Sequence, residues 1–416
     1  MKLKKGFAPD SSIARGPISE LFVSSFLLFN TLTWFYLMRI VVFDFVKGQD
    51  DVVFYGALTL AIISSAVLGT FIVRKIKRIY ILYVWVVIGV ITSIMSVFWT
   101  LLTLNAPLMA FLFGFSFGFG IPSSLSYFAD CVTFENRGRN AGLLFAFTNL
   151  LSLLFLSVLG ENVLSASIVA SLWRIPSLCT LLLVKPHLTE KSPRKSVTFK
   201  SVCSNRSFAL FFLPWLMFCL VDSLERPYTA ALATQFVGED FAAFDRAFEP
   251  LIGTVFALFA GIVADRFGRK RVILSGFIAL GTTFATLSLA PTIPIFWYIA
   301  SAVNGIAWGM FYVIFVMVLW GDLSSENVMR EMYFVLGGIP LFFADFLSQV
   351  ISPFVQNVSR ETVFAAFPVA SFLLFLSVFP LMYAPETLPE KKIRDRELRD
   401  YVEKAKKVKE ERGQKL

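Results

Sequence analysis

Residues 261–271 of the chain read GIVADRFGRKR, in which one acid is followed by four basic residues. This run joins two apolar stretches, residues 246–264 and 271–290. Each stretch has about 20 residues, the length that an α-helix needs to cross the ~30 Å hydrocarbon core of a bilayer. The run is therefore expected to be a short loop at one face of a membrane, between two spanning helices.

The composition extends this interpretation to the whole chain. Of 416 residues, 56% are hydrophobic and 16% are charged, whereas soluble domains carry roughly 25% charged residues. A globule with so few charges could not hide so much apolar surface from water, so lipid must be the solvent for most of it. Apolar stretches of spanning length occur at residues 19–42, 51–73, 79–101, 107–129, 138–159, 163–184, 207–233, 246–264, 271–290, 294–320, 331–355 and 361–384. We expect an all-α integral membrane protein with twelve transmembrane helices.

The basic residues lie mainly on one side of this topology. Before residue 385, 21 Lys and Arg residues fall on the side of the N-terminus, and three fall on the other side, at Lys47, Arg246 and Arg360. Because positive charge accumulates in cytoplasmic loops, both termini are expected in the cytoplasm, and the plasma membrane is the expected location. The net charge of +9 is then a topology signal and not a nucleic-acid-binding surface.

The two halves of the chain correspond at a shift of about 191 residues. Gly114 and Gly118 in the fourth predicted helix match Gly305 and Gly309 in the tenth, and such glycines allow helices to pack closely. Further pairs in nearly the same register are Gly69 with Gly261, Glu135 with Glu326, and Arg139 with Arg330.

These matches indicate a duplicated six-helix unit. The predicted domains are an N-terminal bundle at residues 1–184, a cytoplasmic linker at 185–206, a C-terminal bundle at 207–384 and a basic cytoplasmic tail at 385–416.

The run at residues 261–271 resembles, position for position, the G-x-x-x-D-R-x-G-R-[RK] loop motif of the major facilitator superfamily. With the twelve helices, the two halves and the linker, the resemblance covers nearly the whole chain. It implies the fold of that superfamily and transport of a small-molecule solute across the bilayer by alternating access. We expect a monomer without a cofactor.

The first-half copy of the motif departs from the pattern. Gly69 and its basic residues are present, but Val73 and Ile76 stand where the acid and the second glycine should be. Residues 135–139 and 385–387 look like elements of the sugar-porter branch, which makes sugars one candidate substrate class. The fifth helix lacks the glycine- and proline-rich pattern of the antiporters, and this favours uptake over efflux.

Few residues could support enzymatic chemistry. The cysteines, Cys131, Cys179, Cys203 and Cys219, show no disulfide or metal-ligand spacing, and His187 is the only histidine. A G-x-x-x-x-G-K-[ST] phosphate-binding loop is absent as well. An enzyme, a metal site and an ATP-driven pump are therefore not expected.

Charged residues inside predicted helices are candidates for function, because a charge at the bilayer centre costs roughly 2.5–3.5 kcal/mol on insertion scales. They are Arg39, Arg174, Asp222, Glu225, Arg226 and Asp345. Asp222 and Arg226 stand four residues apart and can pair on one helix. Pro227 removes a backbone donor, so a break in the seventh helix is expected there, as in other transporter sites. The alternative is a self-neutralising pair beside an ordinary proline kink.

The carboxylates are the candidate carriers of a coupling proton. Asp345 has no opposite charge within a turn, and burial penalises the charged form of a lone carboxylate. A structural hydrogen bond to a neighbouring helix is the alternative for Asp345. Asp222 and Glu225 are the other proton candidates. Arg174 could touch substrate or pair with a buried acid in its own half, and Arg39 is expected to extend to the membrane surface.

Polar and aromatic residues form stripes at helical spacing on the tenth helix and, more briefly, on the first. The superfamily builds its cavity from the first, fourth, seventh and tenth helices, so these stripes could bind substrate; packing is the alternative. The candidate substrate-binding residues are Asn30, Trp34, Arg226, Asn304, Trp308, Tyr312 and Gln349.

Charged loops on the cytoplasmic side are candidates for a gate. In the superfamily, such charges hold the inner helix ends together while the cavity faces outward. The candidates are Gly261, Asp265, Arg266, Gly268, Arg269, Glu326 and Arg330 in the second half, and Glu135 and Arg139 in the first. Because Val73 replaces the acid of the first copy, the second half is expected to bear most of this latch. The alternative is that the charges only enforce topology.

The predicted function is secondary active transport of a small organic solute, as proton-coupled uptake. A passive facilitator and an efflux antiporter of drugs or metabolites, both with the same fold, are the alternatives.

Overall fold

The computed structural model describes residues 16–46, 51–102, 106–160, 162–186, 198–324, 330–355 and 359–387. Within these ranges every regular element is a helix, and twelve helical segments are long and apolar enough to cross a membrane. This confirms the predicted all-α membrane architecture. Residues 187–197 of the predicted linker, which include His187, and nearly all of the predicted tail lie outside the described residues, as does Glu326.

The first bundle consists of α1 (Gly16–Val46), α2 (Asp51–Val73), α3 (Arg78–Leu102), α4 (Ala106–Gly118), α5 (Ile121–Cys131), α6 (Arg137–Leu159) and α7 (Val163–Val184). α4 and α5 form one span that is interrupted by a turn at Phe119 and Gly120. Pro122 lies in the first turn of α5, where the backbone N–H that proline lacks would have no partner within the helix.

The second bundle consists of α8 (Phe199–Cys203), α9 (Arg206–Phe236), α10 (Glu239–Phe267), α11 (Arg269–Leu289), α12 (Pro294–Phe311), η1 (Tyr312–Val318), α13 (Leu319–Leu323), α14 (Glu331–Ile351), η2 (Ser352–Val355), η3 (Arg360–Thr362), α15 (Val363–Leu376) and α16 (Val378–Tyr383). α12, η1 and α13 form one span, in which η1 is a π-helical segment. π-Helical turns are rare and occur frequently at functional sites. η1 adjoins the positions equivalent to the turn between α4 and α5 in the first half.

Two local predictions differ from the structure. The eighth span begins at Glu239, not at residue 246, because the helix continues through the charged residues at which the prediction stopped. Glu239 and Asp240 in its first turn interact favourably with the positive end of the helix dipole. The predicted break at Pro227 is wrong: α9 continues through Pro214 and Pro227, since each proline removes only one of the many backbone hydrogen bonds of this 31-residue helix.

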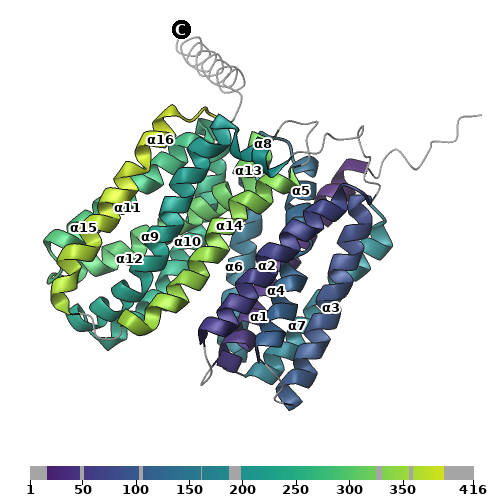
Figure 1. Cartoon of the computed structure of the whole chain (residues 1–416), viewed down its shortest axis with the longest axis horizontal. Helices are drawn as coiled ribbons and strands as arrows, with labels where there is room; N and C mark the ends of the chain where they lie inside the picture. The colour runs from purple at the N-terminus through teal and green to yellow at the C-terminus, as the bar shows by residue number, and fades with distance from the viewer. Residues whose placement is uncertain are drawn as a thin grey trace, which may run out of the picture.

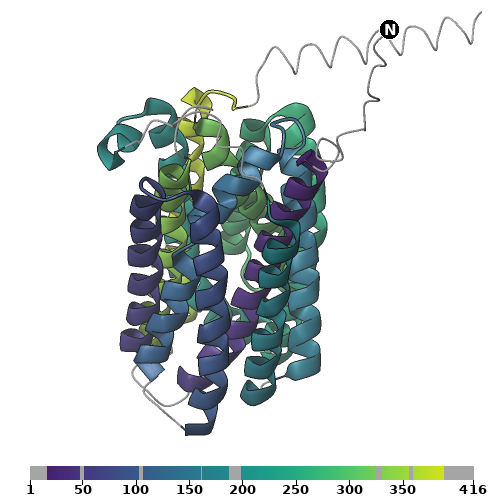
Figure 2. The same ribbon diagram turned by 90° about the vertical axis from the view of Figure 1, so that its right-hand side faces the viewer.

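The two bundles lie side by side (Figure 1). The view turned by 90° shows that the spanning helices run along a common direction (Figure 2). Between the bundles, α6 packs against α10, and α14 packs against α2 and α5. We call the end at which residues 74–77, 132–136 and 268 join successive helices the basic face; α16 ends at this face as well (Figure 1).

The glycine pairs of the two halves have equivalent structural roles. A Cβ on Gly118 would lie 2.3 Å from the carbonyl oxygen of Ile62, and one on Gly309 would lie 2.4 Å from that of Gly253. The fourth span therefore packs backbone to backbone on the second, and the tenth packs in the same way on the eighth. The predicted close packing at these glycines is confirmed.

Candidate functional site

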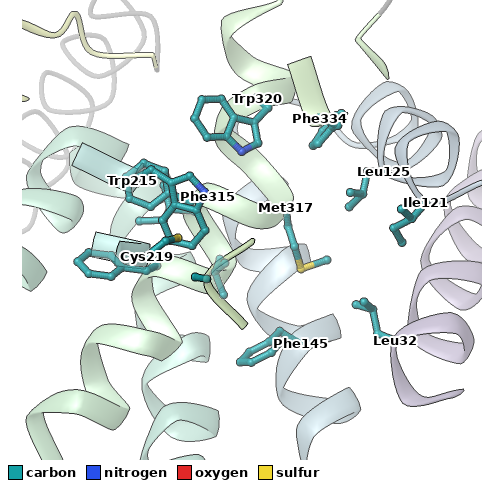
Figure 3. Packing of buried hydrophobic residues seen from close by; sticks show 14 of the residues in the cluster. Leu32, Ile121, Leu125, Phe145, Trp215, Cys219, Phe315, Met317, Trp320 and Phe334 are labelled. Atoms are coloured by element: carbon teal, nitrogen blue, oxygen red, sulfur yellow. The ribbon is translucent and has the colours of Figure 1, made fainter. Parts of the chain in front are cut away.

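A cavity of about 660 Å³ lies between the bundles and is lined by residues of both. Near the basic face its walls are apolar. Figure 3 shows Met317 of η1 reaching into the space between the bundles, opposite Leu32, Ile121 and Leu125 of the first bundle. The charged lining residues lie farther from the basic face, on the later turns of α1, α9 and α14 and the early turns of α10.

Arg226 is shared by two carboxylates in this polar part of the cavity. Its Nη2 lies 2.5 Å from Oδ2 of Asp222 on the same helix, and its Nη1 lies 3.6 Å from Oδ1 of Asp345 on α14. The Asp345 and Arg226 side chains are 42% and 48% exposed, whereas Asp222 is buried. The residues near Asp345 in the sequence suggested a lone carboxylate. The structure shows instead that Asp345 has a partner, which comes from another helix. The predicted pair of Asp222 and Arg226 is present.

Trp308, in the tenth span, contacts both Asp222 and Arg226. Its indole Nε1 donates to Oδ1 of Asp222 at 2.9 Å, and the Arg226 guanidinium lies 5.8 Å from its ring centroid. Tyr312, one turn further along, stacks on Phe145 of α6 with ring centroids 4.1 Å apart. The predicted stripe on the tenth helix thus lines the cavity and contacts the first bundle.

Two carboxylates in the cavity have neutral partners. Glu225 of α9 accepts a hydrogen bond from Thr229 at 2.5 Å, and Glu249 of α10 accepts one from Asn304 at 3.1 Å. Neither forms an ion pair with any of the residues that the structure describes. Glu249 was missed in the sequence because it lay within a turn of the end of a predicted helix, where charges are unremarkable.

Asn30 and Trp34 lie outside the cavity lining, in the packing of the first bundle. The Asn30 amide donates to the carbonyl of Trp173 at 2.6 Å, and the Trp34 indole donates to Oγ of Ser93 at 2.6 Å. Their expected contact with substrate is thus not supported, because the stripe on α1 faces α3 and α7. Gln349 is also absent from the lining.

Arg174 is fully buried next to this stripe. Its guanidinium lies 5.1 Å and 4.8 Å from the ring centroids of Trp34 and Trp85, and it donates to the hydroxyl of Thr31. Among the described residues no acid pairs with it, so the expected acidic partner in its own half is replaced by aromatic rings. Arg39, in contrast, lines the cavity.

At the basic face, Asp322 binds one arginine from each bundle. Arg137, at the start of α6, donates through Nη1 to Oδ1 of Asp322, and Nε of Arg269 lies 3.1 Å from its Oδ2. All three side chains are almost completely buried. Arg269 also lies 3.0 Å from Asp265. We call these four residues the Asp322 cluster.

Asp130 has the corresponding place in the first half. It lies 2.7 Å from Nη1 of Arg78 and 3.0 Å from Nη1 of Arg330, which belongs to the second bundle. Arg78 also lies 2.6 Å from the buried carboxylate of Glu331 at the start of α14. We call these four residues the Asp130 cluster. Each cluster joins the two bundles by ion pairs.

Asp265 also caps a helix of the other bundle. Its carboxylate accepts the backbone N–H groups of Gly138 at 2.9 Å and Arg139 at 2.7 Å, at the positive end of α6. A Cβ on Gly138 would lie 2.7 Å from the Asp265 carboxylate, so only glycine fits there. Val73, its counterpart in the first half, has no carboxylate with which to cap α14.

The sequence model of the Major Facilitator Superfamily matches residues 249–412. Among solved structures, the human organic anion transporter MFSD10 aligns with a TM-score of 0.61 and 13% identity, over 88% of this chain and 99% of its own. The proton:xylose symporter XylE bound to 6-bromo-6-deoxy-D-glucose aligns with a TM-score of 0.67 and 14% identity, over 89% and 96%. A bacterial homologue of the iron transporter ferroportin, in an outward-facing state, aligns with a TM-score of 0.67 and 13% identity, over 88% and 98%.

The protein has the major facilitator superfamily fold. This confirms the resemblance that residues 261–271 indicated. No curated protein matches the sequence. Because these structures are less than 25% identical to the chain, they establish its architecture and leave its substrate open.

The predicted gate residues that the structure describes lie at the basic face as follows. Asp265 and Arg269 belong to the Asp322 cluster, and Arg330 belongs to the Asp130 cluster. The side chains of Arg266 and Arg139 are exposed. The backbone N–H of Arg139 donates a hydrogen bond to the carboxylate of Asp265. Glu135 is half-buried, and Gly261 packs against the backbone of Gly138. Gly268 adopts a φ of 104° as the chain passes from α10 to α11.

Five residues of the two clusters were not among the predicted gate residues: Arg78, Asp130, Arg137, Asp322 and Glu331. The internal repeat contained a signal for two of them, since Asp130 and Asp322 are related by nearly the same shift as the glycine pairs.

The element that resembled a sugar-porter motif has a structural contact. Glu386 accepts the backbone N–H groups of Arg269 at 2.8 Å and Lys270 at 3.2 Å, at the start of α11. Its negative charge there is favourable because of the helix dipole.

Proposed function

We propose that the protein is a secondary active transporter that moves a small organic solute by alternating access, coupled to protons and in the direction of uptake. The fold and the cavity between its bundles support solute transport. The shared Arg226 is the observation that carries the proposal for proton coupling.

In this proposal the basic face is cytoplasmic, as the distribution of Lys and Arg predicts. The Asp322 and Asp130 clusters then close the cytoplasmic end, and the cavity faces outward. Alternating access requires these interbundle ion pairs to separate so that the cavity can open on the cytoplasmic side.

Asp345 is the proposed proton carrier. Its side chain is 42% exposed, so a proton can reach it from the cavity. When Asp345 is protonated, Arg226 keeps its closer partner Asp222 at 2.5 Å, and no unpaired cation is left behind. Protonation therefore breaks the ion pair between α9 and α14 and loosens α14 inside the cavity, while the hydrogen bond from Trp215 of α9 to the carbonyl of Gly337 of α14 remains. A partly exposed pair contributes about 0–1 kcal/mol, enough to shift a two-state equilibrium by up to about fivefold.

Uptake into proteoliposomes tests this proposal. A labelled solute library is first screened on the wild type with and without a pH gradient. With the solute found, Asp345→Asn should lose gradient-driven accumulation but keep solute exchange at equal pH. Glu239→Gln, which removes an exposed carboxylate at the start of α10, should behave like the wild type.

Two results would overturn the coupling proposal. Uphill accumulation by Asp345→Asn would show that Asp345 does not carry the proton. Wild-type uptake that ignores pH would favour a passive facilitator or a different coupling ion over proton coupling.

A further inference from the structure

We propose that the part of the cavity away from the basic face binds organic cations, with Glu225 and Glu249 as their counter-ions. This inference rests on the proposed transport function and names its substrate class.

The two carboxylates are placed to attract a cation. They project from α9 and α10 into the same cavity, and their charges are close enough to interact. Glu225 is 9% exposed, and its hydrogen-bond partner is the hydroxyl of Thr229; that of Glu249 is the amide of Asn304. Glu249 is half-buried. A buried carboxylate that forms no ion pair is costly, so a positively charged ligand gains attraction that a neutral one does not.

The charge balance of the lining favours the same ligand. Its titratable side chains are Tyr36, Arg39, Glu225, Arg226, Asp245, Arg246, Glu249, Tyr312 and Asp345, with Asp222 directly behind Arg226. Arg226 already lies between two carboxylates. Arg246 is exposed, adjoins Asp245 in the sequence and donates to a backbone carbonyl of its own helix. Arg39 has interactions of its own. An anion would have to displace existing partners. A cation meets two carboxylates that form no ion pair with the described residues; Arg226 attracts both of them, but its ion pairs are with Asp222 and Asp345.

The remaining walls suit the body of an organic ion. Trp308, Tyr312 and Phe145 present aromatic rings to the cavity, and such rings attract cations through their faces. Ser301, one turn before Asn304 on α12, lines the cavity with a buried hydroxyl that has no hydrogen-bond partner among the residues that the structure describes. This hydroxyl can accept an N–H from a ligand. The volume of about 660 Å³ is within the usual range for small-molecule sites, roughly 300–1,000 Å³.

A pair of probes with one shape and opposite charge tests the inference. Binding of labelled tetraphenylphosphonium and tetraphenylborate is measured on the purified full-length protein. The cation should bind saturably, and the anion should bind at least roughly tenfold more weakly. Glu225→Gln and Glu249→Gln should each weaken cation binding roughly ten- to hundredfold, as expected when one charge several ångströms from the ligand is removed at an effective dielectric constant of about 20–40.

Matched variants separate charge from folding. Glu239→Gln removes a carboxylate at the exposed start of α10 and should leave the affinity unchanged. Glu249→Asp keeps the charge and should restore most of the affinity lost in Glu249→Gln. Acidification should weaken binding of the cation, because a proton on either carboxylate removes its attraction.

Equal binding of the two probes, or wild-type affinity for the cation in both glutamine variants, would overturn the inference. The outcome is independent of proton coupling. If the cation binds as expected but wild-type uptake ignores pH, the proposed coupling fails and the cation site remains; if uptake is proton-driven and the probes bind equally, the reverse holds.

Discussion

Neutralising Asp322 should open the basic face. Asp322→Asn leaves Arg137 and Arg269 buried without the carboxylate that they share. Removal of one partner of a buried ion pair costs about 3–5 kcal/mol, and because Arg269 keeps Asp265 at 3.0 Å the lower end applies. The loss falls on the state in which the bundles meet, since Arg137 comes from the first bundle. About 3 kcal/mol corresponds to a change of roughly 150-fold in a two-state ratio.

The assay is the rate at which a cysteine inside the cavity reacts from the basic face. Leu125→Cys lies at that end of the cavity and is introduced into a variant that keeps Cys219 as its only native cysteine. An impermeant maleimide applied at the basic face should label it roughly 100-fold faster when Asp322→Asn is added. Asp130→Asn should accelerate labelling only about fivefold, because Asp130 is 20% exposed and partly exposed pairs contribute about 1 kcal/mol.

The reasoning is refuted if the labelling rate is the same with and without Asp322→Asn, or if Asp130→Asn has the larger effect. Cys219 is buried in α9 and should stay unlabelled while the fold is intact. Labelling of Cys219 would instead reveal unfolding, and Asp240→Asn, an exposed carboxylate on α10, should not change either rate.

Two further outcomes are expected. Cysteines placed at Lys47 and Arg360 should react with an impermeant reagent from outside the cell, and a cysteine at Lys270 should not. The opposite pattern at two of these sites would contradict the predicted topology. Gly309→Ala should lower the thermal unfolding temperature, because its Cβ would lie 2.4 Å from the backbone oxygen of Gly253. Gly56→Ala should not, because its Cβ would lie 3.5 Å from the Phe346 ring, an ordinary van der Waals distance. Equal unfolding temperatures would contradict the tight packing of α12 on α10.

The architecture was predictable from the sequence because its determinants are local or periodic. Spanning length, loop charge and the register of Gly118 with Gly309 can each be measured along one chain. The failed prediction at Pro227 has a different cause. A proline removes one backbone hydrogen bond wherever it stands, and whether a helix breaks there depends on the packing around it, which the sequence alone does not show.

The site was only partly predictable because its pairs connect distant residues. Asp222 and Arg226 are neighbours on one helix, so their spacing indicated the contact. Asp345 lies on another helix, and its distance to Arg226 follows from how α14 packs against α9. Two nearby arginines show that the sequence does not reveal which side of a helix is buried. Arg137 is buried and Arg139 is exposed, because different sides of the first turn of α6 face the second bundle and the solvent.

α14 connects the two ends of the proposed mechanism. Glu331, at its first residue, pairs with Arg78 of the other bundle, and Asp345, about four turns later, pairs with Arg226 of its own bundle. The helix is thus held to the first bundle at the basic face and to α9 inside the cavity. A proton that removes the second contact leaves the first in place, so protonation alone should loosen α14 without opening the basic face. In the proposed mechanism, opening then requires the interbundle pairs of both clusters to separate. Arg330 leaves Asp130 and Glu331 leaves Arg78 in one cluster, and Arg137 leaves Asp322 in the other. The step between proton binding and release of solute therefore lies at the basic face.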